Sequence, residues 1–281
     1  MKPLKKIALF GAAALAFASI LPLQAAEKHL TILFAVPGLD FPFFVHMADA
    51  IKAEANKVGG IDIIVSDGQR SSTKETADVE AAITKGVDGI VISPNDVDAL
   101  APAIQEAVDA KIPLVTVDRR VNKVPGLLAH VGADNVKGGE AQGQLIEKLF
   151  PNGANVMNLQ GQSGASPAID RNKGLHNVLD QAKDKYKFVF EDTAGFDRSK
   201  GLAMTESALA GMSTPPDVID EIYPWNACSW MKCVSRPGAP EALTAVDITS
   251  SSSGNAFSVT SARGRFSSPR GQWGLGQNVR R

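Results

Sequence analysis

The chain has 281 residues, 44% of them hydrophobic, which is enough for one large globular domain or two smaller ones. It carries 29 Lys and Arg against 30 Asp and Glu, so its formal net charge at pH 7 is −1. This balance excludes a strong field that would steer nucleic acid or anionic lipid to the surface, and we expect no nucleic-acid partner.

The first 26 residues have the pattern of a secretory signal peptide. Three lysines precede an apolar run from Ile7 to about Leu23, and small residues follow that run. We expect cleavage after Ala25 or Ala26 and export of the mature chain. An uncleaved membrane anchor is the alternative, but the small residues at the exit favour cleavage.

From residue 30 onward, short apolar runs alternate with amphipathic segments. Continuous apolar runs are typical of strands buried on both faces, and they occur at 30–36, 61–67, 88–93 and 112–118. Apolar residues at three and four spacing predict helices within 43–59, 71–86 and 96–111. Ser72 or Thr73 can cap the second helix. This order predicts a doubly wound α/β lobe over residues 27–132.

A second α/β series follows and predicts another lobe over residues 133–219. The same criteria predict helices near 136–149, 167–182 and 198–210, and strands at 154–160, 187–192 and from 215–219. The pattern stops there, so we expect the second lobe to be incomplete.

Residues 220–281 differ in composition from the rest of the chain. All three Trp and both Cys lie in this segment, and no helical period is visible in it. We predict an irregular or disordered tail. Cys228 and Cys233 could form a disulfide in an oxidising compartment.

Ligands of an open parallel sheet bind at the carboxyl ends of its strands. At these ends stand Phe41, Phe43, Phe44, Ser93, Asp118, Arg119, Arg171 and Phe196. A carboxylate accepts hydroxyl protons, a guanidinium donates in a fixed fork, and aromatic rings cover the apolar faces of a sugar. Singly, each Phe could belong to the core and each charge to a solvated loop. Together they favour a site for a polyhydroxylated ligand, while Arg120 is expected to be a solvated neighbour.

Six segments carry a more specific pattern: DFPFF, ISPNDVDAL, IPLVTVDRR, GADNVKGGEAQG, LQGQSGASPAIDRNKGL and AGFDRSKGL. In them the chain resembles ribose-type periplasmic sugar-binding proteins of ABC importers, over about residues 30–219. The resemblance implies the type I periplasmic binding fold, an α/β fold of two doubly wound parallel-sheet lobes joined by a hinge. It also implies a periplasmic monomer without cofactor that captures a monosaccharide and meets a membrane permease.

The resemblance also implies roles for individual residues. Phe43 and Phe44 would stack on the sugar, Phe196 would close its far face, and its hydroxyls would bind Asp118, Arg119 and Arg171. Ser93 stands where ribose binders carry Asn, and Phe41 replaces another Asn. The bound sugar therefore need not be ribose.

The chain departs from the family pattern after residue 219. Family members continue with an Asn-Asp motif, a strand that ends in Phe-Asp and a late Gln at the hinge, none of which is recognisable here. We hypothesise a frameshift or an aberrant gene model, which would leave a cleft wall and a hinge segment missing and could abolish binding. Translating the encoding DNA in all three frames tests this, since the idea fails unless another frame restores these motifs.

An exported hydrolase is the alternative from another class. The segment GQSGA (161–165) partly resembles a G-x-S-x-G nucleophile elbow with Ser163 as nucleophile. However, its last position is Ala165, and His176 is the only later histidine. A tight turn is favoured, and no catalytic residue is expected. The first strand lacks a dinucleotide-binding glycine fingerprint and the four histidines are scattered, so neither a nucleotide cofactor nor a metal site is expected.

Overall fold

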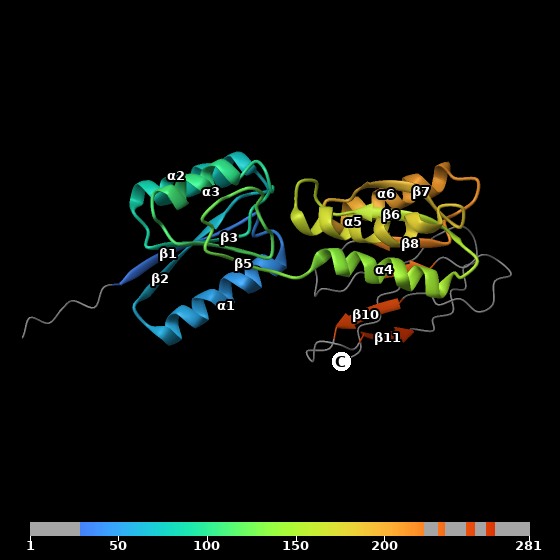
Figure 1. Ribbon diagram of the computed structural model, residues 1–281, viewed down its shortest axis with the longest axis horizontal. Helices are drawn as coiled ribbons and strands as arrows, with labels where there is room; N and C mark the ends of the chain where they lie inside the picture. Colours follow the sequence, from blue (N-terminus) through green and yellow to red (C-terminus); the bar gives the residue numbers. More distant parts are fainter. Residues whose placement is uncertain (1–28, 222–229, 234–245, 251–256, 262–281) are drawn as a thin grey trace, which may run out of the picture.

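The computed structural model describes residues 29–221, 230–233, 246–250 and 257–261. Two α/β lobes lie side by side, and the chain passes between them from β5 (Ala129–Val131) to α4 (Asn135–Leu149) (Figure 1). The predicted α/β class with two lobes is confirmed. The expected signal peptide and Cys228 lie outside the described residues.

The first lobe is a five-stranded parallel sheet with helices on both faces. Its sheet has the order β2-β1-β3-β4-β5. In Figure 1, α1 covers one face and α2 and α3 cover the other. In chain order the elements before β5 are β1 (Leu30–Val36), α1 (Pro42–Val58), β2 (Ile61–Asp67), α2 (Ser72–Lys85), β3 (Gly89–Ile92), α3 (Ala101–Asp109) and β4 (Leu114–Val117).

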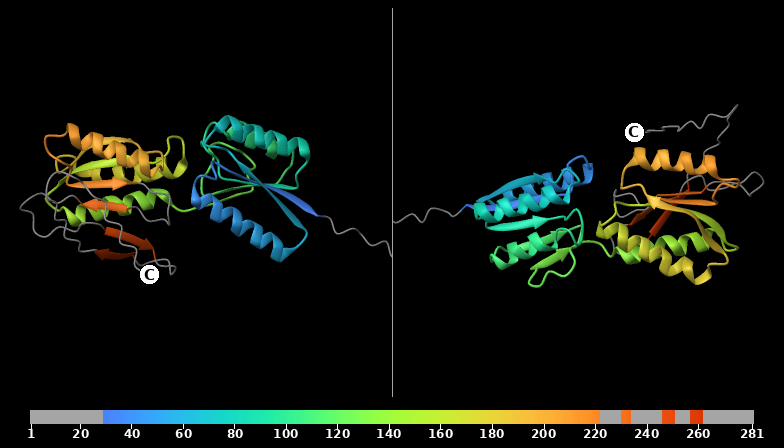
Figure 2. Two further views of the ribbon diagram at one scale, coloured as in Figure 1. Left: turned by 180° about the vertical axis from the view of Figure 1, so that it is seen from behind. Right: turned by 90° about the horizontal axis from the view of Figure 1, so that it is seen from above.

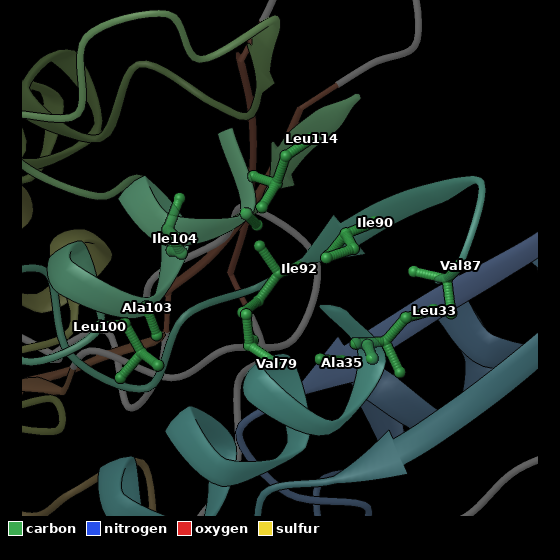
Figure 3. Close-up of a cluster of buried hydrophobic side chains, with 12 residues drawn as sticks. Leu33, Ala35, Val79, Val87, Ile90, Ile92, Leu100, Ala103, Ile104 and Leu114 are labelled. Carbon is green, nitrogen blue, oxygen red and sulfur yellow. The ribbon is translucent and has the colours of Figure 1, made fainter. Parts of the chain in front are cut away.

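Strand β1 shows why its apolar run is continuous. Leu33 and Ala35 pack toward α2 and α3, in the cluster that Figure 3 shows around Ile92. Phe34 and Val36 point to the other face and pack toward α1. All four are almost fully buried, as expected for a strand covered on both faces.

Two predicted helix starts shift in the structure. The α2 cap is Ser71, whose hydroxyl accepts the N–H of Lys74 at 3.3 Å, rather than Ser72 or Thr73. Helix α3 begins at Ala101, because the Asp96 carboxylate accepts the N–H groups of residues 98 and 99 and holds a turn there. The loop before α3 is therefore free to face the second lobe.

The second lobe has a six-stranded sheet of order β11-β10-β9-β8-β6-β7. Strands β7, β6 and β8 are parallel, and β9 to β11 are antiparallel. Figure 2 shows α6 on one face and α4 and α5 on the other. Besides α4, the elements are β6 (Ala154–Gln160), α5 (Ser166–Leu179), a 3-10 turn (Asp180–Ala182), β7 (Tyr186–Thr193), α6 (Arg198–Gly211), β8 (Val218–Glu221), β9 (Trp230–Cys233), β10 (Val246–Ser250) and β11 (Phe257–Ser261). The sequence pattern did not predict β5, and it predicted an irregular or disordered tail where β9 to β11 extend the sheet.

Helices α4 and α5 approach closely through glycines. A Cβ atom at Gly139 of α4 would overlap the backbone carbonyl of Arg171 on α5. A Cβ atom at Gly174 would likewise overlap the carbonyl of Val136. This contact fixes the turn of α5 that carries Arg171.

Candidate functional site

A cavity that is partly open to solvent lies between the two lobes. It is lined by Phe41, Phe43, Phe44, Asp118, Arg119, Pro167, Arg171 and Phe196. Six of the seven residues that were given binding roles from the sequence are thus brought together. Phe43, Phe44, Asp118 and Arg119 come from the first lobe, and Arg171 and Phe196 come from the second. Phe41, which the sequence also placed at a strand end but without a binding role, lines the cavity too, whereas Pro167 was not selected.

The aromatic wall is built at the start of α1. Phe43 and Phe44 lie in its first turn, and their ring centroids are 5.1 Å apart in an edge-to-face arrangement. Phe41 meets Phe44 at 5.9 Å and carries the Arg70 guanidinium 4.0 Å above its ring. These rings provide apolar surface beside charged groups.

Two lining residues have left-handed backbone conformations. The φ angle is +61° at Asp118 and +58° at Phe196. Such angles are uncommon outside glycine and cost about 1–3 kcal/mol each, most of all for a bulky residue such as Phe. Gly161 makes room for Phe196, because a Cβ atom there would overlap its ring. Strain of this kind clusters at ligand sites.

Arg119 lines the cavity and is itself buried, with 3% of its surface exposed. Its Nη1 donates to the Asn95 carbonyl at 3.2 Å and to Oε1 of Gln162 at 3.3 Å. Its Nε lies 4.0 Å from the Asp118 carboxylate. Burial lowers the pKa of Arg119 to about 10, against the opposing charges of Asp118 and Glu75, so the guanidinium remains charged at neutral pH.

Asp118 and Arg171 bring opposite charges from the two lobes to one cavity. Burial raises the pKa of Asp118, and the charges of Arg119 and Arg171 oppose that rise. Burial lowers the pKa of Arg171, and the Asp118 charge opposes the change. The described lining therefore offers one carboxylate and two guanidiniums to a ligand.

Glu75, which no sequence pattern singled out, is fully buried, and the charge of Arg119 acts on it. Its Oε2 accepts the N–H of Asn95 at 2.7 Å, and its Oε1 has no hydrogen-bond partner among the described residues. Burial raises its pKa to about 7, although the Asn95 bond and the Arg119 charge oppose this. Asp78 and Lys74 also act on it, in opposite directions.

Stability is expected to fall as pH rises through the range in which Glu75 ionises. Its pKa is about 7 when folded and ordinarily 4.5, so the stability it contributes is complete below pH 4.5 and is lost as pH rises through 7. Glu75→Gln should remove about 3 kcal/mol of this pH dependence. Urea unfolding at pH 5 and pH 8 measures it, with exposed Glu80→Gln on the same helix as control. Parallel pH profiles for wild type and Glu75→Gln would contradict this.

Arg120 is not the solvated neighbour that the sequence predicted. Its Nε and Nη2 donate to the two oxygens of Asp170 at 3.1 and 2.8 Å, and its backbone N–H donates to Ser166 Oγ at 2.9 Å. Both partners belong to α5, in the other lobe. The prediction was wrong because it considered one lobe at a time, whereas this residue faces a second lobe.

Ser93 does not line the cavity. It is fully buried, its N–H donates to the Ala35 carbonyl at 2.9 Å, and its Oγ has no partner among the described residues. It directly follows β3, at the start of the loop that carries Asn95. That loop, rather than Ser93, reaches the second lobe.

The hydrolase alternative finds no support in the geometry. Ser163 is exposed. The ring nitrogens of His176 lie 3.2 Å from Asp180 and 2.9 Å from Glu191, and its ring stacks on Phe188. Both ring nitrogens are therefore engaged by acidic side chains. His176 also lies near the C-terminal end of α5, away from the loop that carries Ser163.

Two further findings concern the described ranges only. No three His, Cys, Asp or Glu side chains gather there in a way that could hold a metal ion. None of the helices in the same ranges has both the length and the apolar character needed to cross a membrane.

The sequence profile of the periplasmic binding protein domain matches residues 32–250. This chain belongs to that family. Ribose import binding protein RbsB of Bacillus subtilis (strain 168) is 41% identical over 187 residues, which cover 66% of this chain and 59% of that protein. Galactofuranose-binding protein YtfQ of Escherichia coli (strain K12) is 32% identical over 208 residues, covering 73% and 64%.

A solved structure, the Caulobacter myo-inositol binding protein bound to myo-inositol, superimposes with a TM-score of 0.65. It is 36% identical, and the match covers 68% of this chain and 64% of that one. The match to the Bacillus relative thus spans 59% of that relative's length. The profile match continues past residue 219, into the segment that the motifs left unmatched. The comparisons favour neither the hydrolase nor the frameshifted alternative.

Proposed function

We propose that this protein is a periplasmic substrate-binding protein that captures a monosaccharide for an ABC importer. The cavity between the lobes carries the proposal, because it combines aromatic rings with Asp118, Arg119 and Arg171. Relatives named for ribose and galactofuranose and a neighbour bound to myo-inositol support a polyhydroxylated ring as ligand.

Within this proposal the lining residues contact different parts of the sugar. Phe43, Phe44 and Phe196 cover the apolar faces of the ring. Asp118 accepts hydroxyl protons, while Arg119 and Arg171 donate to hydroxyl oxygens from opposite lobes. Ser93 has no place in this set, since it does not reach the cavity.

The remaining parts of the chain follow the same proposal. A signal peptide over residues 1–26 directs export, and residues 27–132 and 133–219 form the two binding lobes. The divergent segment 220–281 contributes strands β9 to β11 to the sheet of the second lobe. The protein acts as a monomer without catalysis or cofactor. Its closed form presents a surface to a membrane permease.

A thermal-shift screen tests the proposed function. The panel contains D-ribose, D-galactose and myo-inositol, with D-galacturonate added because the described lining holds two guanidiniums and one carboxylate. A ligand at about 100 times its Kd adds about 2.7 kcal/mol, which raises the Tm of a chain this size by about 5–10 °C. Sucrose serves as the control for nonspecific osmolyte stabilisation. Equal small shifts for every compound would refute monosaccharide binding.

A further inference from the structure

The loop between β6 and α5, which contains GQSGA, contacts the first lobe. Its second residue, Gln162, reaches from the second lobe to the first. Gln162 Nε2 donates to Asn95 Oδ1 at 2.7 Å and to the Asn95 carbonyl at 3.3 Å. Its Oε1 accepts from Arg119 Nη1 at 3.3 Å.

Arg119, Asn95 and Gln162 therefore form a closed ring of hydrogen bonds. Arg119 Nη1 donates to the Asn95 carbonyl as well as to Gln162, so each residue contacts the other two. A guanidinium is planar, so fixing one terminal nitrogen sets the directions of all its donors. The hydrogen bonds to Asn95 and Gln162 therefore also set the directions of the other Arg119 N–H groups.

Asn95 is a firm anchor for this ring. It is 6% exposed. Glu75 accepts its backbone N–H at 2.7 Å, and Ser72 Oγ accepts from its Nδ2 at 2.9 Å. The first lobe thus supplies a fixed support, and Gln162 is the member of the ring that comes from the other lobe.

We propose that Gln162 is a positioning residue for Arg119, which holds the guanidinium from the opposite lobe. This inference rests on the proposed sugar-binding function. A backbone bond from the Val97 N–H to the Gly164 carbonyl, 3.0 Å long, holds the same loop against the first lobe. Arg119 Nη1 is therefore held from both lobes at once.

Three variants of the full mature chain separate positioning from simple bridging. Gln162→Leu removes every bond of the side chain. Gln162→Glu keeps an acceptor for Arg119 but loses the amide donor to Asn95. Ser163→Ala, at the exposed neighbouring position, is the matched control.

The first readout is D-ribose affinity by calorimetry. Gln162→Leu should weaken binding about tenfold, the scale of one lost hydrogen bond to a charged group. Gln162→Glu should stay within about threefold of wild type, and Ser163→Ala should be unchanged. Equal losses in the Leu and Glu variants would show that Gln162 only bridges the lobes and would overturn the positioning role.

The second readout needs no sugar, so it separates failure of this inference from failure of the proposed function. Nitrogen-15 NMR follows rotation of the Arg119 guanidinium about its Nε–Cζ bond, which is slow when Nη1 is held. Rotation should become faster in Gln162→Leu and remain slow in Gln162→Glu and Ser163→Ala. Unchanged rotation in Gln162→Leu would overturn the inference whether or not D-ribose binds.

Discussion

Asp118→Ala is expected to abolish the sugar-dependent rise in Tm. Asp118 is the only carboxylate among the described lining residues, and it faces Arg119 and Arg171. Without it the sugar loses a charged acceptor, and two buried guanidiniums lose their nearest opposing charge. The affinity loss should exceed about 100-fold, or about 2.7 kcal/mol. Thermal-shift titration with the most stabilising sugar of the panel measures it.

Two companion variants make this result specific. Asp118→Asn preserves shape and an acceptor but removes the charge, so it should retain part of the affinity. Asp49→Ala on the exposed side of α1 should leave binding unchanged. A sugar-induced shift of full size in Asp118→Ala would remove this residue from the site.

Gly139→Ala is expected to lower the free energy of unfolding by about 1–3 kcal/mol, the usual cost of overpacking. The added methyl group would meet the Arg171 backbone carbonyl, which no change of rotamer can move. The preceding residue provides the matched control. A Cβ atom at Gly138 has nothing within 4 Å, so Gly138→Ala should stabilise α4 by about 0.5–1 kcal/mol.

The two alanine variants should therefore shift stability in opposite directions, although they are neighbours on one helix. Urea unfolding measures both. Because the Gly139 contact is with the residue that carries a lining guanidinium, Gly139→Ala should also weaken sugar binding, while Gly138→Ala should not. Stabilisation by both substitutions would mean that α4 and α5 do not pack as closely as described.

Much of the first lobe could be predicted because the local pattern of apolar residues indicates which strands are buried. The unbroken apolar run at β1 reflects cover on both faces, with Leu33 packed one way and Phe34 the other. Selecting the polar and aromatic residues at the strand ends then identified most of the cavity lining, because parallel strands end at a common edge of the sheet. Asp118 and Arg171 are examples from the two lobes.

Contacts between segments that are distant in sequence could not be predicted in this way. Glu75 reads as an ordinary polar residue in the first turn of a helix, and only the approach of Asn95 and Arg119 gives it a role. Arg120 reads as a loop end until α5 brings Asp170 to it. Such pairings depend on tertiary geometry between residues 20 to 50 apart in sequence, for which periodicity carries no signal.

The most direct test of the central claim is calorimetric titration of one sugar into wild type, Asp118→Ala and Arg171→Ala. If a monosaccharide is held between the lobes, wild type should bind one sugar per chain. Each variant, one from either lobe, should then lose more than about 100-fold in affinity. Wild-type affinity in both variants, or no binding of any monosaccharide by the wild-type chain, would contradict that claim.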